Sequence, residues 1–417
     1  MTSRERVLAS VSHHEPDILP LDLGSTPSSG ISAIAYNRLK KELKMDTGHT
    51  RVYDVVQQVA QIEDTVIQAL GVDVLDIGRA FHNTDEDWYD VRLPDGSTAQ
   101  YPQWFHPVPR PDGSWEVFSP QGEKIARMPA GATFFDQTYF PYLEGYPDTY
   151  ENLEEAMGKV LWSALAHSPW DCSKEPDFYQ QLRQKAIELR NTTDKALMIV
   201  CGCNLFEWGT FLRRIDNFLM DIYTEPEQVE RLVAELTERH LQTLEKVCEA
   251  VGDVVDILRF GDDLGMDSGL FMAPEKYRQI FKPYHRKLCD YVHSHSQMKT
   301  FLHSCGSIYP IIGDLIDAGY DILNPVQTSA RQMEPETLKR EFGRDITFWG
   351  GGCNTRTILN LATPREVYDY TRRMIEIFLP GGGFVFNQEH NILPDVPPEN
   401  ILAMLQAVQD ARGQSFH

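Results

Sequence analysis

The sequence has no long apolar run, and this absence limits the classes of protein to which it can belong. None of the apolar segments in the 417 residues approaches the roughly eighteen consecutive apolar residues that a membrane-spanning helix requires. The first residues, Met-Thr-Ser-Arg-Glu-Arg-Val-Leu, lack the apolar core of a secretory signal peptide. We therefore expect a cytoplasmic protein with no membrane partner.

Basic residues are scarce relative to acidic ones. Lys and Arg together number 39 and Asp and Glu number 61, which gives a formal net charge of −22. Binding to nucleic acid requires a basic face that neutralises phosphates, so this composition excludes nucleic acid as an expected partner. A local basic pocket for a carboxylated substrate is still compatible with it.

Cysteine is also sparse, and its distribution argues against a disulfide framework. The count of seven is odd, and the residues are scattered along the chain rather than regularly spaced. In a reducing cytoplasm such thiols stay free and are available as metal ligands. The seven are Cys172, Cys201, Cys203, Cys248, Cys289, Cys305 and Cys353.

Short apolar segments alternate with helical patterns, and this alternation predicts the fold. Alternation of this kind indicates parallel strands joined by crossover helices, and eight strands fit a closed (β/α)8 TIM barrel of the α/β class. Predicted helices include residues 53–70 and 274–295. The predicted strands are residues 18–24, 72–78, 196–204, 254–263, 298–304, 320–327, 346–352 and 383–390.

A doubly wound open sheet is the alternative to the barrel. Such sheets usually have a Gly-x-Gly-x-x-Gly turn for a dinucleotide after the first strand. Here that place reads Gly24-Ser-Thr-Pro-Ser-Ser-Gly30, which does not fit the pattern. The sequence therefore favours a single barrel domain over residues 1–417.

One segment interrupts the alternation after the second predicted strand. Residues 84–128 contain the turn signals Pro94-Asp-Gly, Pro111-Asp-Gly and Pro120-Gln-Gly, separated by runs rich in Tyr, Trp, Val and Phe. We predict a small antiparallel β insertion here, which continues as a β-rich or irregular segment over about residues 84–150.

A His-x-Cys sequence ends the fifth predicted strand. His303 and Cys305 are two residues apart, so in an extended strand both side chains point the same way. An imidazole beside a thiolate supplies two of the three protein ligands of a typical catalytic zinc site. Cys353, which follows the three glycines that end the seventh predicted strand, is the predicted third ligand. The alternative is that Cys305 and Cys353 are buried apolar residues, as free cysteines often are.

Three more residues at or near strand ends are candidate catalytic groups, because barrel enzymes place their chemistry at the C-terminal ends of the strands. They are Asp76, Glu207 and His390. For each the alternative is a structural role, as a helix cap or a loop residue. Asp262 or Asp263 could orient His303 as a hydrogen-bond acceptor.

Cys201 and Cys203 form a second Cys-x-Cys pair, at the end of the third predicted strand. They could share one face of that strand and compete with the first pair as metal ligands. No histidine accompanies them, so we interpret them as core residues.

These segments together resemble the uroporphyrinogen decarboxylase superfamily, and within it the cobalamin-dependent methyltransferases. The resemblance implies a (β/α)8 barrel and a zinc triad of His303, Cys305 and Cys353, in an enzyme that moves methyl groups to or from a corrinoid. The similar segments are Ser3-Arg-Glu-Arg-Val-Leu, His14-Glu-Pro-Asp17, Gly71-Val-Asp73, residues 259–265 and 274–283, His303-Ser-Cys-Gly306, Gly350-Gly-Gly-Cys353 and residues 381–387.

The chain departs from the decarboxylases of that superfamily at two places. They have an arginine-rich substrate motif after the first strand, where this chain reads Leu23-Gly-Ser-Thr-Pro-Ser-Ser. Their Asn-x-Gly-His-Gly motif corresponds here to the bulkier Asn387-Gln-Glu-His-Asn. These enzymes also need no metal, so a His/Cys/Cys set favours the methyltransferases.

We therefore expect a zinc-dependent methyltransferase that works with a corrinoid. Its small-molecule partner would be a thiol acceptor or a methyl donor, such as a methoxylated aromatic that undergoes O-demethylation. The chain has no His-rich corrinoid-binding motif, so a separate corrinoid protein is the expected partner. The alternative function is a metal-free decarboxylase like uroporphyrinogen decarboxylase, in which Asp76 stabilises the protonated substrate.

Overall fold

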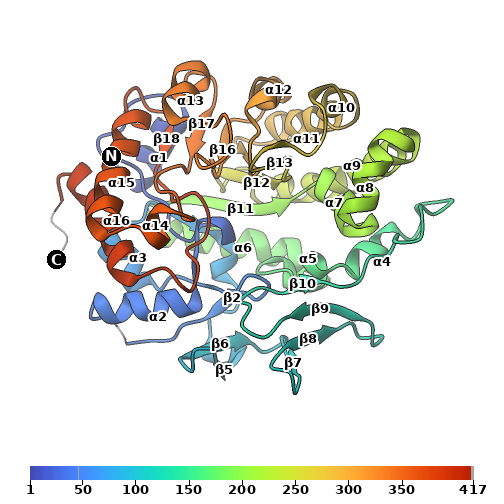
Figure 1. Ribbon diagram of the computed structural model, residues 1–417, viewed down its shortest axis with the longest axis horizontal. Coiled ribbons are helices and arrows are strands. Elements are labelled where there is room, and N and C mark those ends of the chain that lie inside the picture. Colours follow the sequence, from blue (N-terminus) through green and yellow to red (C-terminus); the bar gives the residue numbers. More distant parts are fainter. Residues whose placement is uncertain (46, 415–417) are drawn as a thin grey trace.

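The computed structural model describes residues 1–45 and 47–414, and a parallel sheet of seven strands lies at its centre. Figure 1 shows the helices arranged around this sheet. The strand order is β18-β17-β16-β15-β12-β11-β4, so neighbours in the sheet follow the order of the sequence. The strands are β4 (Val74–Asp76), β11 (Ala196–Gly202), β12 (Ile257–Gly261), β15 (Lys299–His303), β16 (Ile322–Asn324), β17 (Thr347–Trp349) and β18 (Phe384–Val385).

The segment around Leu21 lies between the two edges of this sheet and closes it. Leu21 forms a parallel bridge with Phe386. The amide of Asp22 donates to the Phe386 carbonyl at 2.9 Å, and the amide of Asp73 donates to the Leu21 carbonyl at 2.8 Å. The predicted first strand is therefore reduced to a bridge, because Pro20 has no N–H for a longer ladder. The predicted (β/α)8 barrel is confirmed.

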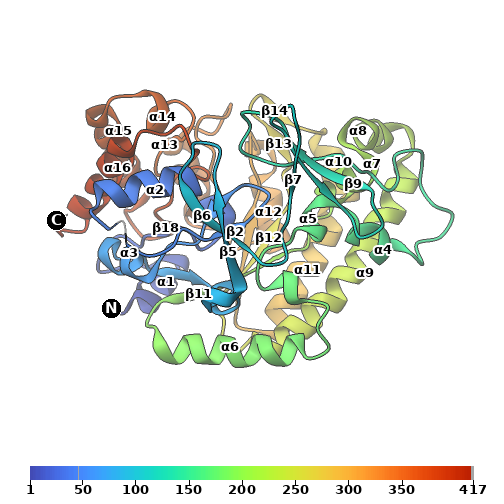
Figure 2. The same cartoon turned by 90° about the horizontal axis from the view of Figure 1, so that it is seen from below.

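The helices lie around the outside of the barrel (Figures 1 and 2). Within the described residues, no helix combines the length and the apolar composition needed to cross a bilayer. The helices are α1 (Ser3–Val11), α2 (Ala33–Glu42), α3 (Asp64–Leu70), α4 (Leu153–Gly158), α5 (Leu161–Ala164), α6 (Phe178–Thr192), α7 (Phe206–Arg213), α8 (Ile215–Thr224), α9 (Pro226–Val251), α10 (Pro274–Ile280), α11 (Lys282–His295), α12 (Ile312–Ala318), α13 (Pro335–Phe342), α14 (Ile358–Leu361), α15 (Pro364–Phe378) and α16 (Pro398–Ala411).

Two predicted helices differ from the structure. The helix predicted over residues 274–295 is divided into α10 and α11 at Phe281, because Pro283 fits only the first turn of a new helix. The helix predicted over residues 53–70 is correct only for α3. Its first half forms the short strands β2 (Val52–Asp54) and β3 (Val59–Ala60), whose β-branched valines favour extended backbone.

The predicted antiparallel insertion is confirmed. A hairpin and a separate antiparallel sheet of order β10-β9-β8-β7 lie on one side of the barrel (Figure 1). The hairpin pairs β5 (Trp88–Arg92) with β6 (Thr98–Pro102). The other strands are β7 (Val108–Pro109), β8 (Trp115–Phe118), β9 (Lys124–Met128) and β10 (Asp136–Gln137).

An apolar layer of side chains fills the lumen of the barrel, and a polar layer lies next to it, toward the C-terminal ends of the strands. Val7 and Val11 of α1 pack with the apolar lumen residues, all of them buried. Because residues i and i+2 of a strand share a face, the polar side chains two positions further along point into the same lumen. The apolar residues Val74, Ile257, Phe301 and Ile322 are followed in this way by Asp76, Arg259, His303 and Asn324.

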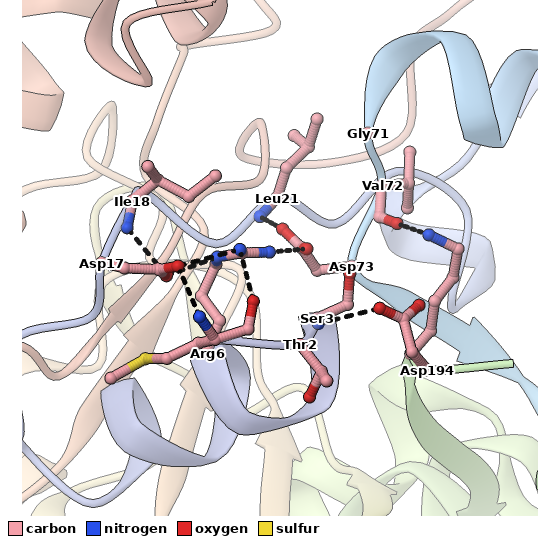
Figure 3. A network of polar contacts seen from close by, with 12 residues as sticks. Thr2, Ser3, Arg6, Asp17, Ile18, Leu21, Gly71, Val72, Asp73 and Asp194 are labelled. Atoms are coloured by element: carbon pink, nitrogen blue, oxygen red, sulfur yellow. Dashed lines mark hydrogen bonds and ion pairs between the residues drawn. The ribbon is translucent and has the colours of Figure 1, made fainter.

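A buried carboxylate, Asp73, ties the closing segment to the barrel (Figure 3). It accepts the Leu21 amide at 2.9 Å and pairs with Arg6 of α1 at 2.7 Å. Arg412, which follows α16, pairs with the other side of the same carboxylate and donates to the Leu19 carbonyl at 2.8 Å. Two cations from opposite ends of the chain thus meet at one carboxylate.

Replacing Asp73 with Ala is expected to lower the free energy of unfolding by about 3–5 kcal/mol, because Arg412 would remain buried without its partner. Urea denaturation followed by circular dichroism measures this change. The control is Asp369→Ala, which removes an exposed ion pair with Arg365 and should have little effect. Equal stability of the two variants would contradict the assigned role of Asp73.

Candidate functional site

His303 is held in one orientation by its neighbour on the next strand. Its Nδ1 atom lies 2.5 Å from Oδ1 of Asn324, and Nδ2 of Asn324 donates to the Trp349 carbonyl at 2.7 Å. The second bond fixes which end of the amide faces His303, so Nδ1 carries the proton and Nε2 keeps a free lone pair. Sequence reasoning assigned this orienting role to Asp262 or Asp263. Asn324 performs it.

Three potential metal ligands meet at this imidazole. Sγ of Cys305 lies 3.5 Å from Nε2 of His303, and the ring of His390 lies 5.6 Å from the His303 ring, centroid to centroid. One ligand atom from each of the three residues lies within 4.8 Å of the other two. Two imidazoles and a thiol suit zinc, which accepts nitrogen and sulfur ligands in a tetrahedral arrangement.

Cys353 lies outside this cluster. It is fully buried, its polar neighbours are Thr371 and Glu389, and burial raises the pKa of its thiol to about 12. Strand alternation stops determining side-chain direction at Trp349, because Gly350 and Gly351 both have positive φ and turn the chain. Within the described residues, the side chain that lies within 4.8 Å of His303 and Cys305 is therefore that of His390, and the predicted third ligand Cys353 is not part of this group.

Two carboxylates lie beside the cluster. Asp263 accepts the Cys305 amide at 2.8 Å, and its Oδ1 is 3.7 Å from Nε2 of His303. Glu207, near the start of α7, accepts a hydrogen bond from the side-chain amide of Asn204. Burial raises the pKa of both carboxyl groups, and the charge of Asp263 adds to the effect on Glu207. A cation between them would offset this unfavourable burial.

Asp262 has a structural role. It is fully buried and accepts the amides of Leu205, Phe206 and Glu207 at the beginning of α7, at 2.8–3.2 Å. Its Oδ2 also lies 3.0 Å from Nε2 of His285. The residue therefore anchors the helix that positions Glu207, and its neighbour Asp263 faces the ligands.

The other predicted residues lie elsewhere in the barrel. Asp76 is at the end of β4, accepts the Gly78 amide at 3.1 Å, and has its pKa raised to about 6 by burial. Burial also raises the pKa of both Cys201 and Cys203. In the part of the chain that the structure describes, neither cysteine belongs to a group of three metal-binding side chains.

Comparison with known proteins shows which family this part of the chain resembles. Residues 206–411, which include all three clustered ligands, match the family described as Uroporphyrinogen decarboxylase (URO-D). The predicted resemblance to the uroporphyrinogen decarboxylase superfamily is confirmed. Asp76 lies outside the matched residues, whereas Glu207 and Cys353 lie within them.

Two curated relatives are uroporphyrinogen decarboxylases. A stretch of 103 residues is 29% identical to the one from Methylococcus capsulatus, and 117 residues are 26% identical to the one from Magnetococcus marinus. These stretches cover 25% and 28% of this chain, and only 27% and 30% of the two relatives.

A solved structure, a methyltransferase from Methanosarcina mazei, is similar over 98% of this chain and 99% of its own. Its TM-score is 0.57 at 16% identity, which establishes a shared fold over the whole barrel.

Asp76 predicts a pH-dependent stability. Its pKa is about 6 in the folded protein and about 3.8 when unfolded, so the folded state holds the proton more tightly. Stability should therefore fall as the pH rises from about 4 to 6 and stay lower above that range. Asp76→Asn should remove this loss and stabilise the protein by about 2–3 kcal/mol at pH 8, with little effect at pH 4.

Urea denaturation at both pH values measures this difference. Asp290→Asn, on the exposed face of α11, is the matched control and should leave stability unchanged at either pH. An Asp76→Asn variant that is no more stable than wild type at pH 8 would show that the Asp76 carboxylate is well solvated there.

Proposed function

We propose that this chain is a methyltransferase that moves a methyl group between a small molecule and a corrinoid held by a separate protein. In this proposal zinc is bound by His303, Cys305 and His390. The observation that carries the proposal is the convergence of these three side chains at the C-terminal end of the barrel, beside the oriented lone pair of His303. The likeness in fold to the Methanosarcina mazei methyltransferase supports it.

The donor set fits zinc, and the fourth position of a tetrahedral site would be open to substrate. When bound, the metal would supply Lewis acidity at the oxygen, nitrogen or sulfur atom that exchanges the methyl group. Asn324 keeps Nε2 of His303 deprotonated for this purpose. Asp263 fixes the backbone of Cys305 through its amide and so limits where the thiol can lie.

Glu207 is the proposed proton donor in the demethylation direction. Burial raises the pKa of its carboxyl group, which favours the protonated form relative to an exposed glutamate. When the methyl group passes to the corrinoid, the oxygen it leaves gains an electron pair and needs a proton. Glu207 would supply that proton, and with a thiol acceptor its carboxylate form would take the thiol proton instead.

A metal-free decarboxylase is the second candidate, and the match of residues 206–411 to the decarboxylase family favours it. In that reaction Asp76, with a pKa of about 6, would stabilise a protonated substrate. This decarboxylase candidate predicts that carbon dioxide is still released in the presence of a chelator. The two candidates therefore differ in their need for metal.

Metal content tests the proposed ligand set. Purified wild-type protein is expected to contain about one zinc per chain by elemental analysis, and Cys305→Ala and His390→Ala should lose it. Cys353→Ala is the matched control and should keep its zinc, because its thiol lies outside the cluster. Loss of zinc from Cys353→Ala with retention in His390→Ala would assign the third ligand to Cys353.

Methyl transfer tests the reaction itself. Wild-type protein is incubated with cob(I)alamin and methoxylated aromatics, or with methylcobalamin and thiols, and the corrinoid absorption is followed. Transfer should be lost in Cys305→Ala and in the chelated wild type. Zinc-free protein without methyl transfer, together with chelator-resistant decarboxylation, would reject the methyltransferase in favour of the second candidate.

The orienting bond from Asn324 gives a separate prediction. Asn324→Ala should weaken zinc binding by about 10–100-fold, because His303 would lose the acceptor that selects its tautomer. Competition with a chromophoric chelator measures the affinity. Asn360→Ala, which removes a surface bond to Asp395, is the control and should bind zinc as the wild type does.

A further inference from the structure

A cation without a counter-ion lies in the lumen next to the ligand cluster. Arg259 is on β12, two residues beyond the buried Ile257, and its Nε atom is enclosed without a hydrogen-bond partner. Its single polar contact in the described residues is a long bond of 3.5 Å from Nη2 to Oγ of Ser28, and no carboxylate there forms an ion pair with it. A guanidinium can donate five hydrogen bonds, so this one is far from satisfied.

The surroundings connect Arg259 to the metal ligands. Ser28 also lies 3.4 Å from Oδ1 of Asn324, the atom that orients His303. The charge of Arg259 acts on Cys305 and on Asp263 through the same space. Contacts through Ser28 and Asn324 therefore connect the guanidinium of Arg259 to His303.

A second unpartnered group lies near enough to Arg259 for the charge of the guanidinium to act on it. The hydroxyl of Tyr53 is buried and has no hydrogen-bond partner, and its ring packs edge-on against His167 at 5.5 Å between centroids. Burial raises the pKa of this hydroxyl, with the carboxylate of Asp76 next in effect, so it stays protonated and can donate. Tyr53 and Arg259 are thus two buried donors without an acceptor, and the charge of Arg259 acts on the Tyr53 hydroxyl.

We infer that Arg259, with Ser28 and Tyr53, forms a subsite for the carboxylate of a small organic substrate whose other end reaches the His303–Cys305–His390 cluster. A planar guanidinium matches a carboxylate through paired hydrogen bonds, and burial strengthens such bonds. Residues 23–30, after the first strand, contain no arginine, so Arg259 is the cationic group of the proposed subsite. The assignment of the other end rests on the proposed function.

Equilibrium binding of matched probes tests the subsite without requiring methyl transfer. The probes are benzoate, 3-methoxybenzoate and 4-methoxybenzoate, each compared with its neutral amide by calorimetry. Wild-type protein should bind at least one acid about tenfold or more tightly than its amide. Arg259→Gln should remove this preference while zinc content stays at the wild-type level. Arg365→Gln, an exposed arginine on α15, is the control and should keep the preference.

A second variant covers the case in which Arg259→Gln does not fold. Arg259→Lys keeps the positive charge but loses the paired N–H donors of the planar guanidinium. It should therefore bind the acid several-fold more weakly than wild type and still prefer the acid to the amide. Absence of any preference in wild type, an unchanged preference in Arg259→Gln, or displacement of the acid by equimolar inorganic phosphate would each overturn the inference.

Failure of the subsite and failure of the proposed function give different results. Acid preference in a protein without zinc or methyl transfer would support the subsite and reject the methyltransferase. Methyl transfer from neutral donors without any acid preference would support the methyltransferase and reject the subsite.

Discussion

Two residues along a β-strand return a side chain to the same face, and this period decides what the barrel presents to a substrate. Phe301 belongs to the apolar layer of the lumen, so His303 must point into the same lumen one step nearer the open end. The same step takes Ile257 to Arg259 on the neighbouring strand. The apolar layer of the lumen and the polar chamber formed by the next layer of side chains therefore both follow from the two-residue period of the strands.

Groups of opposite charge line the chamber and act on one another, but within the described residues they form no direct ion pair with Arg259. Asp263 and Glu207 lie on the side of the ligand cluster, and Arg259 is on the next strand, with Ser28 and Asn324 between it and His303. Burial makes each of these charges costly when it has no partner. Such an arrangement is typical of a site that is completed by what it binds, a cation on one side and an anion on the other.

The barrel could be predicted from the sequence because its strands are short apolar runs separated by helical patterns. His303 and Cys305 were predicted as neighbours for a local reason, the alternation within one strand. The third side chain of the cluster was not predictable in this way. Cys353 follows two glycines with positive φ, which redirect the chain, and His390 approaches from the far edge of the sheet. Asn324 was missed because its role depends on pairing between β15 and β16, which fixes it opposite His303.

The order of the strands along the chain has a consequence for biosynthesis. β15 brings His303 and Cys305, but His390 follows β18, which is the last strand of the barrel. Arg412, which helps to hold Asp73 and the closing segment, comes later still. Until β18 has been synthesised, the growing sheet therefore holds only two of the three clustered side chains. If the cluster binds metal as proposed, the complete three-ligand site forms only after the last strand of the barrel has joined the sheet.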